Sequence, residues 1–320
     1  MDSCTSYKAN ESDDWIVKLV AEGRYFGSKY GPVMRKWILL SGALTSVDQL
    51  FDVYLWNYRQ LTHGILMFDS GIVDGTTDNG TGMDDRITVN AYAMNYVSNG
   101  VNLVEFLEAF CNAAKKDGYA EAQVFIDDLR REYDGNFNYA LAHTLRNHAQ
   151  HGQLIVSLCP DDNDRQHAGF DLYQLRNPIF FTNKELFEKR IDIYQKIIES
   201  VCSGSVKLSF YCEVTAIHES ICQLTSNFID AVSRYYEDCS GEIEETYKLL
   251  PEYVIRDGGG GVFSIFIDDQ TDDSEAHLLI GDPKEMLDSF QTLRKRVLEE
   301  LQLATQEYEE MRKHLKPLNR

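Results

Sequence analysis

The chain has 320 residues, and its 51 acidic residues against 31 Lys and Arg give a formal net charge of -20. An apolar fraction of 43% and an aromatic fraction of 12% are typical of a folded globular protein and exclude a disordered one. The acidic balance also argues against a protein that coats nucleic acid through a broad basic surface. An RNA contact would need a local basic pocket, and its affinity would fall steeply with salt.

Several kinds of segment are missing from the sequence pattern. The first residues carry no basic stretch followed by an apolar run, and no segment approaches the ~20 apolar residues of a membrane span. We therefore expect a cytoplasmic protein that makes no membrane contact. The seven cysteines are scattered and form no C-x-x-C pair, which predicts reduced, buried thiols. No metal and no other cofactor is expected.

Helical periodicity dominates the first half of the chain, so the predicted fold class is mainly α. Ser46-x-x-Gln49 and Asn102-x-x-Glu105 have the form of capping boxes, which are typical of helix starts. The run from 71 to 85 is rich in Gly, Asp and Thr and predicts a loop. The predicted helices cover residues 14–23, 32–40, 46–68, 102–117, 119–133 and 136–151.

The second half mixes helical and strand patterns. The apolar run 153–158 predicts a short strand or a buried extension, and the acidic, turn-rich run 160–164 predicts a domain boundary. We expect an N-terminal arm with a short helix (1–33), a helical bundle (34–160) and an α-rich C-terminal region with a small β-hairpin (161–320). The elements expected after residue 161 are strands near 170–173 and 178–181, helices near 182–198, 208–236, 243–250 and 283–315, and a hairpin of 262–267 with 277–280.

One short segment collects side chains that could do chemistry. Three histidines, an arginine, an asparagine and a glutamine fall within the nine residues from 143 to 151. Between Asp134 and Asp161 there is no Asp or Glu, in a chain whose net charge is -20. An acid-free, cationic segment in an acidic chain indicates a place that accepts an anion.

A helix from about 136 to 151 would sort these side chains by face. Apolar residues share one face with His148, and the opposite face carries the polar candidates. Gly152 favours a helix end there, which would place His151 where the helix dipole favours a protonated imidazole. A straight helix separates Arg146 and His151 by about 140°, so their convergence needs a bend, a helix end or a second subunit. The polar candidates are His143, Arg146, Asn147 and Gln150, with His151 at the margin of their face.

The residue types suit a metal-free cleavage of RNA. Arg146 can hold a phosphate through its planar guanidinium, and His151 titrates near neutrality and can take or give a proton. If His151 removed the proton of a ribose 2'-hydroxyl, that oxygen would attack the adjacent phosphorus and release a free 5'-hydroxyl. The Asn147 amide could orient the histidine or the phosphate. The neighbouring side chains predicted to contact substrate are His143, His148 and Gln150.

Arg146-Asn147-x-x-x-His151 resembles the R-x4-6-H signature of HEPN domains, helical modules of many prokaryotic toxin, abortive-infection and CRISPR-associated ribonucleases. The polar residue directly after the arginine belongs to that pattern. The resemblance implies a HEPN-like helical bundle over about residues 34–158, with a C-terminal α+β extension beyond it. It also implies that Arg146, Asn147 and His151 cleave RNA without metal at a cleft between two domains. A homodimer, and an antitoxin or regulatory protein as partner, follow from it.

Three other interpretations stay open. The segment could be a plain helix end whose arginine and histidine cap carbonyls and cover the surface. The protein could be a HEPN-like module that binds RNA or nucleotides without cutting them. It could also be an acidic helical protein that binds a basic partner, an interpretation favoured by the net charge.

Overall fold

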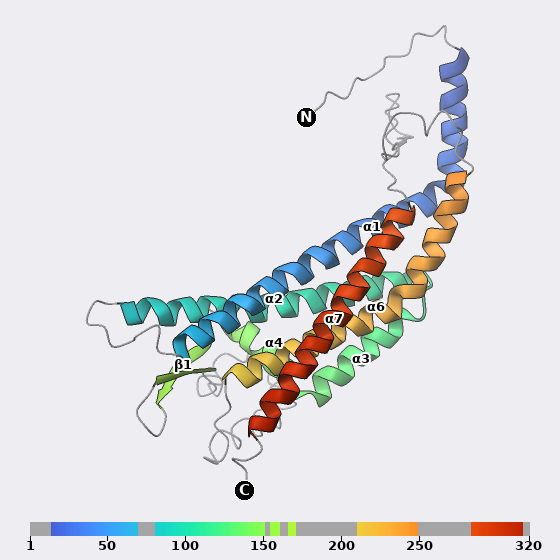
Figure 1. Ribbon diagram of the computed structural model, residues 1–320. Helices are drawn as coiled ribbons and strands as arrows, with labels where there is room; N and C mark the ends of the chain where they lie inside the picture. Colours follow the sequence, from blue (N-terminus) through green and yellow to red (C-terminus); the bar gives the residue numbers. More distant parts are fainter. Residues whose placement is uncertain are drawn as a thin grey trace, which may run out of the picture. The chain divides into compact units, whose positions relative to one another are not determined.

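The computed structural model describes residues 14–69, 81–150, 154–160, 166–170, 210–248 and 283–315 (Figure 1). The prediction of a mainly α protein is confirmed for these residues. The expected strand near 178–181, the helix near 182–198 and the hairpin of 262–267 with 277–280 lie outside them. The elements in chain order are α1 (Asp14–Asp69), α2 (Thr81–Lys116), α3 (Ala122–Gly135), α4 (Phe137–Gln150), β1 (Val156–Pro160), β2 (Gln166–Phe170), α6 (Phe210–Lys248) and α7 (Pro283–Leu315).

The chain divides into two compact units. One consists of Met1–Ser46 with Ser233–Leu293, and the other of Val47–Val232 with Arg294–Arg320. Helices α1, α6 and α7 each contribute to both units. The boundary expected near residue 160 stays a prediction, although β1 and β2, on either side of it, pair antiparallel with Val156 opposite Phe170.

The first unit has an aromatic core. The ring of Tyr236 on α6 stacks on Phe290 of α7 at 4.5 Å between centroids, and its hydroxyl donates to the Leu40 carbonyl of α1 at 3.3 Å. Lys36 lies over the ring of Tyr235 at 5.0 Å. Buried aromatic rings therefore join the segments of the three helices that belong to this unit.

The second unit holds the candidate segment. Helix α3 buries one amphipathic face, and Phe125 from that face contacts Phe228 of α6 edge to face. Phe110 of α2 meets the same ring. Helix α2 packs against both α3 and α4, which pack against each other. The buried face of α3 consists of Ala122, Phe125, Ile126 and Leu129.

The predicted breaks around α3 are confirmed. After α2, Gly118 takes a φ of +96°, a conformation that glycine adopts most easily, and its N–H donates to the Lys115 carbonyl. Between α3 and α4, the side chain of Asn136 accepts a hydrogen bond from the N–H of Asn138 at 2.9 Å. This bond is that of a helix N-cap, so Asn136 starts α4.

Four other predicted breaks are wrong, because the helices continue through them. The first is the gap expected between residues 23 and 32, which lies inside the continuous helix α1. Ser46 donates its hydroxyl to the Gly42 carbonyl at 2.9 Å, a bond to the preceding turn of α1 rather than a cap. Asn102 and Glu105 likewise lie inside α2, which already starts at Thr81, within the run expected to be a loop. Helix α6 runs from Phe210 to Lys248 with no break between the two helices expected there.

A single side chain fixes the start of β1. The Asn90 amide of α2 accepts hydrogen bonds from the N–H groups of Ile155 and Val156 and donates to the Val156 carbonyl at 2.9 Å. The predicted short strand is thereby confirmed from Val156 onward and tied to the bundle. None of the described helices has the length and apolarity that crossing a membrane requires.

Candidate active site

Helix α4 carries the predicted residues from His143 to Gln150 and sorts them by face as expected. Leu141 and Leu145 are fully buried. Arg146 and Asn147 are partly exposed, and Gln150 is exposed. The helix ends at Gln150, and His151 is the next residue of the chain, outside the described residues. The position of the predicted general base relative to Arg146 therefore stays a prediction.

Arg146 is held by two residues of α2. Its Nη2 atom donates to Glu105 Oε2 at 3.0 Å and to Asn102 Oδ1 at 3.2 Å. Asn102 and Glu105 are three positions apart, so both side chains leave the same face of α2. The Arg146 side chain is 17% exposed. Its guanidinium is thus fixed in orientation and mostly covered, with a small part open to solvent.

The other edge of the guanidinium is less engaged. Within the described part of the chain, no acceptor contacts Nη1, and the buried Nε has no hydrogen-bond partner. Arginine has five N–H donors in a fixed planar arrangement, so two acceptors at Nη2 leave donors over. The geometry provides an oriented cation with spare hydrogen-bonding capacity.

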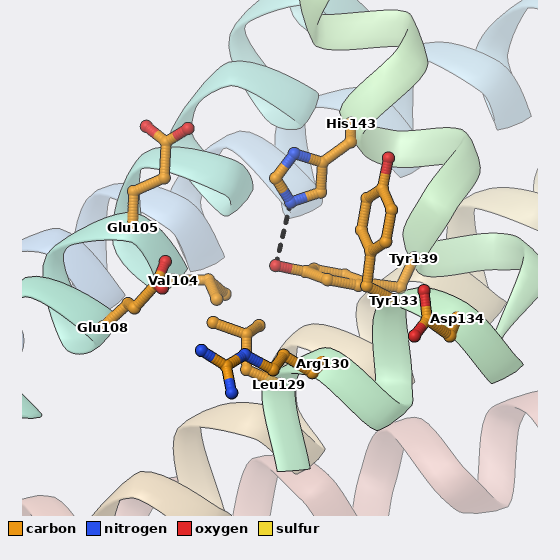
Figure 2. A pocket seen from close by; sticks show the side chains of 9 residues that line it. All are labelled: Val104, Glu105, Glu108, Leu129, Arg130, Tyr133, Asp134, Tyr139 and His143. Carbon is orange, nitrogen blue, oxygen red and sulfur yellow. Dashed lines mark hydrogen bonds between the residues drawn. The ribbon is translucent and has the colours of Figure 1, made fainter. Parts of the chain in front are cut away.

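His143 belongs to a second feature beside Arg146, a hollow of about 250 Å³ between α2, α3 and α4 (Figure 2). We call it the acidic hollow. Figure 2 shows Glu105 and Glu108 on the α2 side, across from Tyr133 and Tyr139. Its lining consists of Val104, Glu105, Glu108, Leu129, Arg130, Tyr133, Asp134, Tyr139 and His143.

The rings of the hollow form a compact cluster. His143 Nε2 lies 2.9 Å from the Tyr139 hydroxyl, and the imidazole meets the rings of Tyr133 and Tyr139 edge to face. Burial raises the pKa of Tyr139, and the negative charges of Glu108 and Glu105 raise it further. The tyrosine therefore stays a neutral phenol in a negative local potential.

This negative potential differs from the expectation for the segment. The stretch of sequence has no acidic residue, yet the structure brings Glu105 and Glu108 of α2 and Asp134 of α3 to the hollow beside His143. An acid-free sequence segment is therefore not an acid-free site, because its neighbours in space come from other helices. Among the predicted residues of α4, Arg146 is the one that carries a permanent positive charge.

His148 is 6% exposed and lies on the buried face of α4. A ring with so little exposure has only a small edge to offer to a ligand arriving from solvent. Its substrate-binding role, like that of Gln150, stays a prediction. Asn102 and Glu105, the partners of Arg146, were missed as site residues, because their spacing also matches a capping box.

The described residues contain no group of three or more His, Cys, Asp or Glu side chains arranged to hold a metal ion. Among the cysteines whose side chains are described, Cys111, Cys222 and Cys239 are free and buried, as predicted for thiols of this kind. Comparison of the chain with protein-family models, with curated proteins and with solved structures found no match.

Proposed function

We propose that the protein is a metal-independent endoribonuclease of the HEPN type, with Arg146 as the phosphate-binding residue and His151 as the general base. The observation that carries the proposal is the Arg146 guanidinium, which Asn102 and Glu105 orient from α2 while Nη1 has no partner among the described residues. A preoriented guanidinium loses little conformational freedom when it binds a phosphate.

In the proposed reaction, His151 takes the proton of a ribose 2'-hydroxyl, and the 2'-oxygen forms a bond to the adjacent phosphorus. The bond from phosphorus to the 5'-oxygen breaks, and that oxygen takes a proton from water. The products are a 2',3'-cyclic phosphate and a 5'-hydroxyl. Arg146 stabilises the negative charge that grows on the phosphoryl oxygens, and Asn147 orients the histidine or the phosphate.

The ion pair with Glu105 has two opposing effects on this role. The carboxylate offsets part of the positive potential that a phosphate would meet, which weakens binding. It also holds the planar group at one angle, which favours a directed contact through the remaining donors. The proposed activity therefore depends on Glu105 for geometry rather than for charge.

The remaining parts of the proposal follow from the HEPN resemblance. The active assembly is a homodimer in a helical bundle, and the protein acts in the cytoplasm as a toxin or phage-defence effector under an antitoxin or regulatory protein. His143, His148 and Gln150 are proposed to contact RNA from α4, with the C-terminal α+β extension outside the bundle.

The test is cleavage of a fluorescent single-stranded RNA in the presence of EDTA. Wild-type protein is expected to cleave it, and His151→Ala and Arg146→Ala are each expected to lower the rate at least about 100-fold. Arg131→Ala is the matched control, because Arg131 is an exposed arginine of α3 paired with Asp128. It is expected to keep the wild-type rate.

The chemistry gives a second, independent readout. An RNA with a single 2'-deoxyribose at the cleaved position should resist cleavage there, because the attacking oxygen is missing. Product ends are identified by mass spectrometry. Cleavage that disappears with EDTA, that persists at the deoxyribose, or that survives His151→Ala would contradict the proposal.

A further inference from the structure

The acidic hollow has a lining that suits a positively charged organic group. Its carboxylates, Glu105, Glu108 and Asp134, attract a cation, and the partly exposed Tyr133 ring lies in the same lining, whereas Tyr139 is only 1% exposed. Leu129, which is 8% exposed, adds a small apolar surface that suits the aliphatic stem of a lysine or arginine side chain. Charge, ring and apolar groups are thus combined in one concave space.

The carboxylates of the hollow differ in their engagement. Glu105 is paired with Arg146, and Arg130 is paired with Asp127, which does not line the hollow. Within the described ranges, neither Glu108 nor Asp134 has an ion-pair partner. Two carboxylates are therefore available to an incoming cation. Burial raises the pKa of the Cys111 thiol, and the negative charge of Glu108 raises it further. This agrees with a negative potential on this side of α2.

The size of the hollow limits the occupant. Pockets for drug-sized ligands have volumes of roughly 300–1,000 Å³, and this one has about 250 Å³. One side chain fits such a space better than a nucleotide does. The absence of a metal-binding group among the described residues favours an ammonium or guanidinium over a bare metal ion.

We propose that the acidic hollow binds a single basic side chain, that of a lysine or arginine, from a partner protein. The net charge of -20 would attract a basic partner over long distances and speed its encounter. The hollow then supplies the specific contact, with Glu108 and Asp134 binding the charge and the Tyr133 ring beside the stem.

The shared residue Glu105 couples this hollow to Arg146. A cation in the hollow competes with Arg146 for the Glu105 carboxylate, which lies in the lining and accepts from Nη2. An occupied hollow would loosen the Arg146 side chain from its fixed orientation. This consequence for RNA cleavage rests on the proposed ribonuclease function, whereas the binding of a basic side chain does not.

The test is an NMR titration of protein labelled with ¹³C in its histidine rings, at low salt. The signal of His143 is assigned as the one lost in His143→Gln. The probe is acetyl-Gly-Arg-Gly-amide, with the Lys and Gln peptides beside it. The Arg or Lys peptide is expected to shift the His143 signal to saturation, and the Gln peptide is expected to leave it in place.

Variants of the lining test the charge. Glu108→Gln with Asp134→Asn is expected to weaken binding of the Arg peptide at least 10-fold. Glu121→Gln, an exposed glutamate outside the hollow, should leave it unchanged. Arg130→Gln is expected to tighten binding several-fold, because Arg130 is a resident cation in the lining. An anion-binding hollow would respond to Arg130→Gln in the opposite direction.

The proposal is overturned if neither basic peptide binds to saturation, if the Gln peptide binds equally well, or if the double variant, with unchanged unfolding, binds like wild type. Agmatine, a small molecule with a guanidinium and an amine, is titrated in a separate experiment. Binding of agmatine at least 10-fold tighter than of either basic peptide would assign the hollow to a small metabolite and overturn the partner side chain. No arm uses RNA, so a failed ribonuclease assay leaves this result intact.

Discussion

Two clusters within the unit formed by Val47–Val232 and Arg294–Arg320 use the same residue types and differ in their access to water. One is the acidic hollow, where His143 is partly exposed. The other, which we call the sealed cluster, surrounds His218 of α6, a side chain only 1% exposed. Each combines tyrosines, a histidine and glutamates.

In the sealed cluster both ring nitrogens of His218 have a hydrogen-bond partner. Nδ1 lies 2.9 Å from the Tyr54 hydroxyl, Nε2 lies 3.2 Å from Glu300, and the Tyr58 ring stacks on the imidazole at 3.6 Å. The Cys222 thiol is 3.8 Å away. Tyr96 donates to the Val214 carbonyl at 2.9 Å, and its hydroxyl lies 3.5 Å from that of Tyr54. Three helices, α1, α6 and α7, meet at one imidazole.

The difference teaches what burial does to the same chemistry. Polar groups without water must bond to one another, so the sealed cluster is saturated and stabilises the packing of its helices. The hollow retains carboxylates with no ion-pair partner in the described part of the chain, which only solvent or a ligand can satisfy. Saturation therefore marks the structural cluster, and spare capacity marks the candidate binding site.

The largest expected effect is that of breaking the sealed cluster. His218→Ala leaves the Tyr54 hydroxyl and Glu300 without a shared partner and opens a cavity, so the free energy of unfolding should fall by about 3 kcal/mol. His143→Ala, the matched change in the hollow, should cost less than about 1 kcal/mol. Urea denaturation followed by circular dichroism measures both. Equal losses would erase the distinction between the two clusters.

A buried carboxylate tests the same contrast through pH. Burial raises the pKa of Glu213 on α6 to about 8, and its Oε1 has no hydrogen-bond partner among the described residues. The folded pKa lies above the unfolded one, so the stability from the neutral acid is complete below about pH 4 and is lost as pH rises toward 8.

Glu213→Gln removes that titration while it keeps the shape of the side chain. The variant should therefore be more stable than wild type at pH 8, by roughly 1–4 kcal/mol, and the two should converge near pH 4. Unfolding in urea at a series of pH values gives the comparison. Glu108→Gln is the matched control, because it makes the same change at a partly exposed carboxylate of the hollow. If the wild type instead gains stability relative to Glu213→Gln from pH 5 to pH 8, the pKa of Glu213 is not raised by burial.

The sequence predicted the elements whose ends are set by local chemistry. One or two residues determine the backbone geometry at each of these boundaries. They are Gly118 after α2, Gly135 with Asn136 between α3 and α4, and Pro283 at the start of α7. Helix α7 covers the range expected for it. Local rules were sufficient there, because no distant residue changes the conformation of such a position.

Prediction failed where one spacing serves two purposes. Residues three apart cap a helix start, and they also share a face inside a helix. Ser46 bonds back to Gly42 inside α1, and Asn102 with Glu105 bind Arg146 from inside α2. Arg146 itself was found from its motif. Its partners were not, since they lie more than 40 positions away in sequence and only the packing of α2 on α4 brings them near.

A double-mutant cycle should show a smaller effect that sharpens the comparison. The coupling between Tyr54→Phe and His218→Ala should be about 1 kcal/mol, because both groups are buried and bond to each other. The coupling between Tyr139→Phe and His143→Ala should be below about 0.5 kcal/mol, since water can reach His143 and replace the lost bond. Unfolding of the four single variants and two double variants measures both cycles. A stronger coupling in the hollow would mean that its rings are as sealed as His218.

The smallest expected effect concerns the pair that links the hollow to α4. Glu105 is 47% exposed, so its ion pair with Arg146 should contribute only about 0.5 kcal/mol to stability. Glu105→Gln keeps an acceptor for Nη2, whereas Glu105→Ala removes it. If the pair serves orientation, RNA cleavage should fall strongly in Glu105→Ala and weakly in Glu105→Gln, while both unfold within about 1 kcal/mol of wild type. A loss of stability that parallels the loss of cleavage would instead make Glu105 a structural residue. Because Gln keeps an acceptor for Nη2 without the negative charge, these two variants separate the effect of Glu105 on the direction of Arg146 from the effect of its charge.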